Sequence, residues 1–182
     1  MNARRISIIG SAGAGKSTFA VRLGTLLELP VIHLDAHYWR PNWISPPRDE
    51  WRAQLQQLFQ GEDWIMDGNY NNTLPERIAA SDAVILLAFP RRICLYRVCK
   101  RALKYWGRSR PDLNAGCREH LPDRQFLRWI WNYPVVNLPV TMQLLRDVEA
   151  EKEVVILRSN RDVERFLRTL DAGSGLNQSG KV

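Results

Sequence analysis

The 182-residue chain has few cysteines and no long apolar run. Its three cysteines, Cys94, Cys99 and Cys117, are an odd and sparse set. Such a set is typical of reduced thiols in a cytosol and excludes a disulfide-stapled secreted scaffold. The longest apolar runs, such as AVILLAF at 83–89, have the length of strands and are far shorter than a membrane span. The N-terminus MNARRISIIG lacks a signal-peptide pattern, so we expect a cytoplasmic protein.

Acidic residues are scarce in one segment. The whole sequence has 26 Lys and Arg against 19 Asp and Glu, a formal net charge of +7. Between Arg91 and Arg128 there are eleven Lys and Arg against three Asp and Glu, so this segment holds the entire basic excess. A local excess of this kind predicts that the segment faces or closes over an anion.

Apolar stretches of strand length alternate with helical patterns along the chain. We expect strands at 4–9, 30–35, 64–68, 83–90 and 153–159, and helices at 16–29, 49–59, 74–80, 91–106, 123–132, 139–150 and 162–170. This alternation is typical of an α/β fold with a parallel sheet covered on both faces. We therefore expect one domain over residues 1–170, followed by a disordered tail at 171–182.

The residues after the first expected strand match the phosphate-binding pattern G-x-x-x-x-G-K-[ST]. The predicted nucleotide-binding residues are Gly10, Ser11, Ala12, Gly13, Ala14, Gly15, Lys16, Ser17 and Thr18. The glycines let backbone N–H groups surround a β-phosphate, Lys16 reaches the β- and γ-phosphates, and the Ser17 hydroxyl is a ligand for Mg²⁺. The helix that starts here adds its positive N-terminal end. The sequence thus predicts ATP and Mg²⁺ as cofactors.

A bound nucleotide could lose its terminal phosphate in a GTPase switch or in a motor-type ATPase, but both classes of protein require motifs that differ from those in this sequence. A GTPase switch needs N-K-x-D, which is absent, and D-x-x-G, which the stretch Asp67-Gly68-Asn69-Tyr70 does not match. A motor-type ATPase usually carries a catalytic Glu after its strand-end Asp, whereas Gly68 follows Asp67 here. The remaining layout favours a small-molecule kinase, a phosphotransferase in which Lys16 is a catalytic cation.

Six motifs follow one another along the chain: GSAGAGKST, VIHLD, WIMDGNYNNT, LLAFPRRICLYRVCKR, GRSRPD and ILRSNRDVERFL. Together they resemble the DNA topology modulation protein family over about residues 4–170. That family is part of a wider group of P-loop kinases that includes adenylate and shikimate kinases. The resemblance implies a P-loop NTPase fold with three α/β/α layers, a parallel five-stranded sheet of order 2-3-1-4-5, a helical lid near 105–122, and phosphoryl transfer.

The resemblance also implies roles for residues that follow strands. Asp67, beside the phosphate loop, would hold Mg²⁺ together with Ser17, as the matching Asp does in related kinases. Gly68 would let the backbone lie close to a ligand. Arg158, just after the last strand, resembles a position that borders the adenine in this group.

The basic segment contains a helix with one cationic face. Helical spacing places Arg97, Lys100, Arg101 and Lys104 together on that face, and Arg108 and Arg110 follow in a Pro-containing loop. Arginines that close from a lid stabilise the charge of a phosphoryl-transfer transition state, so we expect Arg101, Arg108 and Arg110 to be catalytic. Two other interpretations stay open, a solvated basic face and a DNA-binding surface of a nucleotide-dependent topology regulator with little turnover.

The acceptor side is expected at the end of the second strand. Asp35 closes that strand, and transfer to a hydroxyl benefits from a carboxylate that takes its proton. Shikimate-type kinases have an Asp in a similar place, so Asp35 is also the candidate catalytic base. The predicted substrate-binding residues are Asp35, Asp67, Gly68, Asn69 and Tyr70.

A nucleoside monophosphate kinase of the adenylate type is the alternative enzyme. Such kinases carry D-G-F-P-R after the third strand, and its Arg binds the monophosphate. Here the first Arg after Asp67 is Arg77. Arg77, Arg40 or Arg48 could supply the same contact, so this alternative remains.

A zinc site is a further interpretation of two patterns. His33, Asp35 and His37 alternate, which on a continued strand would place three ligands on one face. Cys117 and His120 form a second pair. Neither set supplies the four ligands of a structural zinc site.

Tryptophans are plentiful, with seven in the chain. Trp39, Trp43 and the WIWNY cluster at 129–133 could stack on a base or a sugar. Aromatic residues at such spacing also pack cores and lid hinges, and the sequence leaves both interpretations open.

Overall fold

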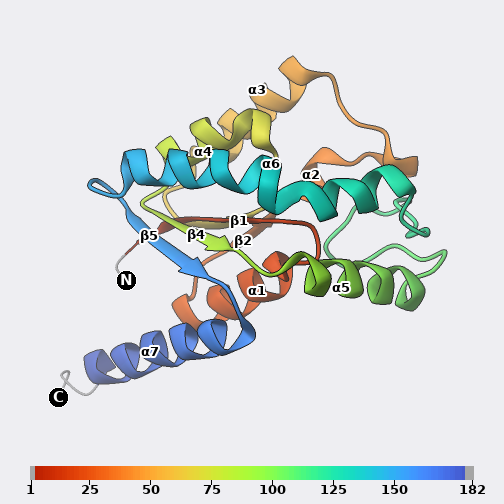
Figure 1. Cartoon of the computed structure of the whole chain (residues 1–182). Coiled ribbons are helices and arrows are strands. Elements are labelled where there is room, and N and C mark those ends of the chain that lie inside the picture. The colour runs from red at the N-terminus through yellow and green to blue at the C-terminus, as the bar shows by residue number, and fades with distance from the viewer. Residues whose placement is uncertain (1–2, 179–182) are drawn as a thin grey trace.

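A five-stranded parallel sheet forms the centre of the computed structural model (Figure 1), which describes residues 3–178, with side chains up to residue 172. The strands are β1 Arg5–Gly10, β2 Val31–His33, β3 Trp64–Asp67, β4 Ala83–Leu87 and β5 Glu153–Leu157. Their order is β2-β3-β1-β4-β5, with every neighbouring pair parallel. This confirms the predicted fold class and places β1, with its phosphate loop, in the middle of the sheet.

Helices cover both faces of this sheet. They are α1 Lys16–Leu27, α2 Leu34–Tyr38, α3 Arg48–Leu58, α4 Leu74–Ala80, α5 Arg91–Lys104, α6 Arg124–Val148 and α7 Asn160–Gln178, with short 3₁₀ turns at Pro41–Trp43 and Asn71–Thr73. In Figure 1, α1, α5 and α7 lie below the sheet, and α3, α4 and α6 lie above it. The result is the expected arrangement of three α/β/α layers.

The strands are apolar on both sides because both sides are buried. Ile6 and Ile8 of β1 pack with Phe19 of α1 and Leu167 of α7. Ile9 of the same strand packs on the opposite face, against α4 and α6. All side chains of β1 after Arg5 are buried, which fixes the position of the loop that follows the strand.

The second strand is shorter than the sequence predicts. It ends at His33, and the chain turns directly into α2, so Asp35 lies in the first turn of a helix rather than at the end of a strand. Leu34 is fully buried beside Trp51 and Met66, and burying it here requires the chain to leave the strand direction. The prediction that Asp35 closes the strand is therefore wrong, although Asp35 stays at the same edge of the sheet.

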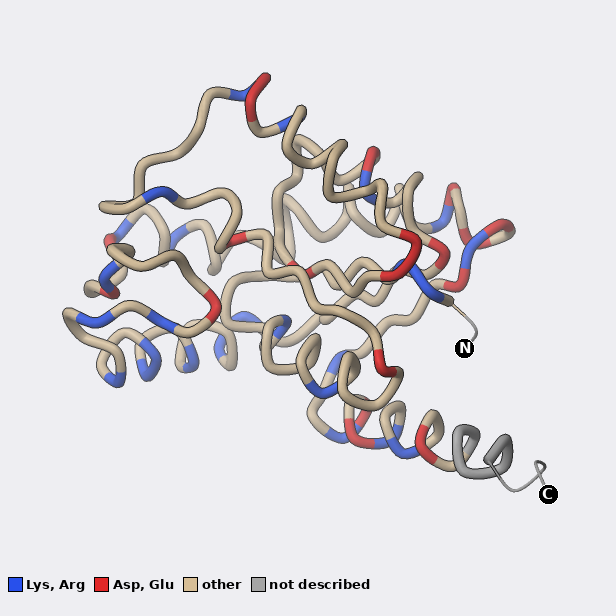
Figure 2. The backbone as a smooth tube through the Cα atoms, turned by 180° about the vertical axis from the view of Figure 1, so that it is seen from behind, with Lys and Arg blue, Asp and Glu red and all other residues tan. Residues whose placement is uncertain are grey.

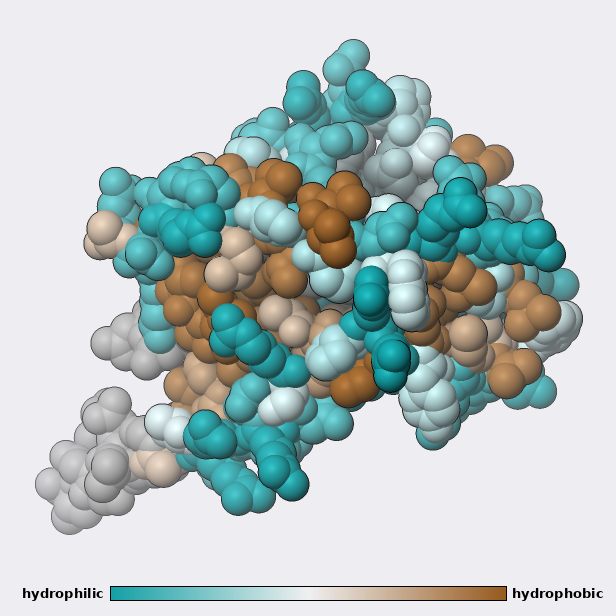
Figure 3. All heavy atoms as spheres, in the orientation of Figure 1, coloured by the Kyte–Doolittle hydropathy of each residue, from teal (hydrophilic) through white to brown (hydrophobic). Residues whose placement is uncertain are grey.

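One helix, α6, replaces the two that the sequence predicts at 123–132 and 139–150. Pro134 and Pro139 both lie inside it, although a proline in a helix interior costs about 3 kcal/mol. The buried residues Ile130, Tyr133 and Leu145 recur at helical spacing, so packing of this stripe outweighs the loss of two backbone hydrogen bonds. Figure 3 shows apolar side chains exposed over the same helix.

The last helix, α7, is longer than the predicted 162–170. It continues to Gln178, so residues 171–178 are helical, while 179–182 of the expected tail lie outside the described residues. In that described part, no helix combines the length and the apolar character that crossing a bilayer requires.

Candidate active site

The phosphate loop is folded around the ammonium group of Lys16. Its Nζ donates hydrogen bonds to the carbonyl oxygens of Gly10 and Ser11, both at 3.0 Å. Burial lowers the pKa of Lys16, although the nearby charges of Asp35 and Asp67 act in the opposite direction. The ammonium thus binds backbone carbonyls rather than a carboxylate, and a phosphate oxygen would be a stronger partner.

Two glycines of the loop are required by its shape. Gly13 has φ +78°, and a Cβ there would lie 2.2 Å from the carbonyl oxygen of Cys94. Gly15, at φ +97°, is the N-cap of α1. Both positions disfavour any residue with a side chain. The loop therefore holds its backbone N–H groups at the start of α1.

Asp67 joins three elements of the site. Its Oδ2 accepts a hydrogen bond of 2.8 Å from Ser17 Oγ, and its Oδ1 lies 2.5 Å from Nδ1 of His33. The hydrogen bond with Asp67 is the main cause of a raised pKa of His33, so the ring is biased towards the form that donates to the carboxylate. Ser17 and Asp67 together offer two hard oxygen ligands beside the phosphate loop, as a Mg²⁺ site requires.

A cavity of about 1050 Å³ opens beside the phosphate loop. Among the predicted site residues, it is lined by Ala12, Gly13, Ala14, Gly15, Lys16, Ser17, Thr18, Asp35, Asp67, Asn69, Tyr70, Arg101 and Arg110. The structure thus brings most of the phosphate loop, four of the five expected acceptor residues and two of the three expected catalytic arginines to one space.

The other predicted site residues lie off the cavity wall: Gly10, Ser11, Gly68, Arg108 and Arg158. Gly10 and Ser11 form the base of the loop and bind Lys16 through their carbonyl oxygens. Gly68 packs closely against Leu34, because a Cβ there would lie 2.9 Å from Leu34 Cβ, and its approach to a ligand stays a prediction.

The two outlying arginines differ in their surroundings. Arg108 is exposed and is tied to the loop through its backbone, which pairs with Glu119. The backbone N–H of Arg158 donates to Asp162 at the start of α7, and its side chain is exposed. Neither side chain lines the cavity in this conformation, so the phosphate contact of Arg108 and the adenine contact of Arg158 stay predictions.

A four-residue ion-pair cluster holds the two arginines of the cavity wall. Nε of Arg101 donates to Glu119 at 2.9 Å, and Arg110 Nη1 donates to Asp112 at 3.0 Å. The Nε of Arg110 also lies 3.3 Å from the second carboxylate oxygen of Glu119. Arg110 and Glu119 are both buried, so each charge is balanced inside the cluster.

Sequence reasoning did not single out Arg97, which lies on the cavity wall beside the phosphate loop. Its Nη1 donates to the carbonyl oxygen of Ala14 at 3.0 Å, its Nη2 binds Asn160, and its guanidinium lies 4.8 Å over the ring of Phe89. In the sequence, Arg97 is one of four basic residues that share a face of α5. Figure 2 shows this helix as a row of blue segments with no red. The place of Arg97 on the turn nearest the phosphate loop distinguishes it from Arg101.

The acceptor side contains a hydrogen-bonded pair. Tyr70 donates its hydroxyl to Asp35 Oδ1 at 2.7 Å. Burial is the main cause of a strongly raised pKa of Tyr70, so the hydroxyl remains a donor at any working pH. Asn69 lies beside them, with its Oδ1 accepting from Tyr133 at 3.5 Å and its buried Nδ2 without a hydrogen-bond partner among the described residues.

The loop at 39–43, here called the aromatic loop, contains Trp39 and Trp43 and is hydrogen-bonded to the expected lid. Asn114 Nδ2 donates to the carbonyl oxygen of Trp39 at 2.9 Å, and Trp43 Nε1 donates to that of Arg118 at 2.8 Å. The backbone N–H of Asn42 donates to the carbonyl oxygen of Gly116 at 3.1 Å. The two indoles line the cavity, so this wall is built from two segments far apart in the sequence.

Comparison with models of protein families and with curated proteins finds no match. Solved structures do match. A shikimate kinase from Acinetobacter baumannii in complex with shikimate aligns with a TM-score of 0.56 at 17% identity, covering 99% of this chain and 97% of that one. A gluconokinase from Sinorhizobium meliloti 1021 aligns with a TM-score of 0.51 at 14% identity, covering 98% of each chain. The fold is that of a P-loop kinase.

Within this fold, none of the three arginines suggested for a monophosphate contact is placed on the cavity wall. Arg77 is fully buried, donates to the carbonyl oxygens of Gly68 and Tyr70, and has its pKa lowered by burial to about 10. Arg40 is paired with Glu50. Arg48 is exposed at the start of α3, and none of the three lines the cavity.

The zinc interpretation is not supported by the positions of its candidate ligands. His33 binds Asp67, not Asp35, and His37 lies one turn further along α2. Cys117 donates to the carbonyl oxygen of Arg40. Within the part of the chain that the structure describes, no group of three His, Cys, Asp or Glu side chains is placed to hold a metal.

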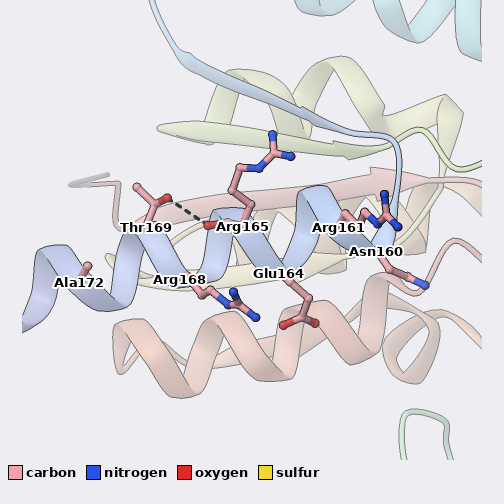
Figure 4. Close-up of a pocket in the computed structure, with 7 residues that line it drawn as sticks. All are labelled: Asn160, Arg161, Glu164, Arg165, Arg168, Thr169 and Ala172. Atoms are coloured by element: carbon pink, nitrogen blue, oxygen red, sulfur yellow. Dashed lines mark hydrogen bonds between the residues drawn. The ribbon is translucent and has the colours of Figure 1, made fainter.

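A second, shallow hollow lies along α7 (Figure 4). Arg161 and Arg165 point to one side of the helix, while Glu164 and Arg168 point towards α1. Glu164 is bound there by Arg22 at 2.6 Å. This hollow is lined by residues of α7 and contains none of the predicted site residues.

Proposed function

We propose that this protein is an ATP- and Mg²⁺-dependent phosphotransferase that moves the γ-phosphate of ATP to a hydroxyl of a small molecule. The observation that supports it best is the shared cavity, in which Lys16 and Ser17 of the phosphate loop and Asp35 line one space. A P-loop kinase needs this arrangement, because donor phosphate and acceptor must meet in line and away from water.

Asp35 is the proposed base. The acceptor oxygen forms a bond to the γ-phosphorus while the bond from that phosphorus to the β–γ bridging oxygen breaks. The hydroxyl proton passes to Asp35, and ADP leaves with the electron pair of the broken bond. Tyr70 already occupies one oxygen of Asp35, so it orients the carboxylate and leaves the other oxygen for the acceptor.

Cationic groups would stabilise the charge on the transferring phosphoryl. Lys16 is closest to the phosphate loop, and Arg97 and Arg101 line the same space from α5. Mg²⁺, held by Ser17 and Asp67, would neutralise phosphate charge when it is bound. His33 orients Asp67 from the side opposite Ser17.

Residues 105–122 are the proposed lid. They carry Arg108 and Arg110, and the backbone of Gly107 and Glu119 pairs across the base of the segment. Movement of this segment would bring Arg108 from the surface towards the phosphates and exclude water. Membership of the DNA topology modulation protein family remains part of this proposal, supported by the order of the six sequence motifs.

The test is transfer of labelled γ-phosphate from ATP to pools of alcohols, sugars, nucleosides, nucleotides and hydroxy acids. At least one pool should yield a phosphorylated product well above the water blank. If no pool does so, and the protein instead binds DNA in a salt-dependent manner, the regulator interpretation replaces the kinase.

A substitution at Asp35 tests whether this residue is the base. Asp35→Asn should reduce transfer by about 10²–10⁴-fold while leaving binding of a non-hydrolysable ATP analogue unchanged. Asp49→Asn is the matched control, because it removes an exposed carboxylate of α3, outside the cavity. Unaltered turnover in Asp35→Asn would reject the base role.

A further inference from the structure

We propose that the phosphate acceptor is an uncharged ring compound with free hydroxyls, a nucleoside or a sugar, and not a phosphorylated compound or a carboxylic acid. This inference rests on the proposed function and adds the class of its acceptor. It follows from the charges and side chains of the acceptor half of the cavity, lined by His33, Asp35, Trp39, Asn69, Tyr70 and Arg110.

The arginine of this half is already neutralised. Arg110 lies between Asp112 and Glu119, at 3.0 and 3.3 Å, and its side chain is only 6% exposed. Because Glu119 also binds Arg101, the two arginines and two carboxylates sum to no net charge. An anionic acceptor would have to break one of these buried ion pairs, which costs several kcal/mol.

The other cations of the cavity wall lie on the side of the phosphate loop, here called the nucleotide half, or at its rim. Lys16, Arg22, Arg97, Arg101 and Lys104 come from the phosphate loop, α1 and α5. His33 faces Asp67, and His120 faces the carbonyl oxygen of Leu121. Asp112 is balanced within the neutral cluster, so Asp35 gives the acceptor half a net negative charge, which repels a second phosphate or a carboxylate.

Hydrogen-bonding groups of this half suit hydroxyls. Asp35 has one oxygen occupied by Tyr70, and its other oxygen has no hydrogen-bond partner among the residues that the structure describes. Asn69 keeps its Oδ1 towards Tyr133, which leaves the buried Nδ2 as a donor. A buried donor without a partner costs about 1–3 kcal/mol, and an acceptor oxygen would remove that cost.

Aromatic rings also line the cavity. The indoles of Trp39 and Trp43 lie 5.5 Å apart at 67°, and the ring of His120 lies 5.8 Å from that of Trp43. All three line the cavity. Rings that meet at such angles present a corner of apolar faces and edges, against which a sugar ring or a base packs better than a short chain.

The experiment measures kcat/KM for labelled phosphate transfer to paired acceptors. Thymidine is compared with thymidine monophosphate, glucose with gluconate and shikimate, and glycerol serves as the uncharged acceptor without a ring. We expect thymidine or glucose to exceed every anionic acceptor and glycerol by at least about tenfold. The thymidine and glucose arms decide between the nucleoside and the sugar.

A variant links the preference to the ion-pair cluster. Asp112→Asn leaves Arg110 with one carboxylate, so the ratio of kcat/KM for thymidine over thymidine monophosphate, or for glucose over gluconate, should fall by about tenfold. Asp147→Asn, an equal charge change on the exposed side of α6, should leave the ratio unchanged.

Each outcome is decisive. Faster transfer to an anionic acceptor, or equal transfer to glycerol, overturns the inference and leaves the proposed kinase activity intact. If phosphate is transferred to none of the acceptors, both the inference and the proposed kinase activity are overturned. The acceptor series uses the unaltered protein, so it decides even if the Asp112 variant fails to fold.

Discussion

Lys16 is the residue whose surroundings are hardest to explain without a ligand. Its ammonium is partly buried, its pKa is lowered by that burial, and its partners are two backbone carbonyls. Lys16→Ala should reduce phosphate transfer by about 10²–10³-fold, because it removes a preorganised charge from the transition state. The measurement is the initial rate of labelled transfer.

The matched control for this prediction is Lys100→Ala. Lys100 is an exposed lysine of α5, packed over Tyr96 on the outer side. It should keep the full transfer rate, and both variants should unfold near the temperature of the unaltered protein. A Lys16 variant with normal turnover would remove the phosphate loop from the mechanism.

Single residues were predicted from the sequence where local spacing fixes their place. Lys16 and Ser17 follow from the loop pattern alone, and the carbonyl partners of Lys16 are also its neighbours in sequence. The contact between His33 and Asp67 spans 34 residues and depends on β2 and β3 being adjacent. Arg97 could not be separated from three other basic residues on its helix, because only the packing of α5 decides which one reaches the loop.

At the scale of elements, the phosphate loop depends on its contact with α5. Gly13→Ala should destabilise the fold by more than about 2 kcal/mol, because the new Cβ would meet the carbonyl oxygen of Cys94 at 2.2 Å and the residue has φ +78°. Nucleotide binding should be lost together with the loop shape. Chemical unfolding and titration with an ATP analogue measure both effects.

Gly107→Ala separates backbone strain from crowding. Gly107 has φ +67°, similar to Gly13, but no atom lies within 4 Å of a Cβ placed there. The cost should be about 1–2 kcal/mol from the positive φ alone. Equal destabilisation by the two variants would show that the contact with Cys94 contributes nothing.

Sequence patterns predict the strands of the sheet but not the continuity of α6 or the end of β2. The sheet was predictable because its strands are short apolar runs separated by helical patterns. The continuous α6 was not, since Pro134 and Pro139 favour a break and only the tertiary packing of Ile130 and Leu145 outweighs them. Likewise, the end of β2 is set by burial of Leu34, a long-range effect.

At the scale of the whole molecule, stability should depend on pH through Asp82. Burial opposes its ionisation, but hydrogen bonds from Arg5 and Arg4 outweigh burial and lower the pKa of Asp82. A lowered folded-state pKa adds stability above the unfolded value of about 3.9, and this stability is lost as the pH falls through the folded value.

The corresponding variant is Asp82→Asn. The free energy of unfolding should fall less between about pH 5 and pH 2 in this variant than in the unaltered protein, as measured by urea titration. Asp147→Asn should keep the original slope, because that side chain is exposed and accepts a hydrogen bond from Gln143 of its own helix. Parallel slopes for the two variants would contradict the role of Asp82 at the edge of β4.

Nucleotide and acceptor sites should respond together, because the proposed lid at 105–122 is fastened to the aromatic loop at 39–43. Hydrogen bonds donated by Asn114, Cys117, Trp43 and Asn42 join the segments. A non-hydrolysable ATP analogue with Mg²⁺ should therefore slow amide exchange in both segments, while exchange in α3 stays constant. Asn114→Ala, which removes one bond, should keep the protection of the lid and weaken that of the aromatic loop. Protection confined to the phosphate loop would mean that no lid closes.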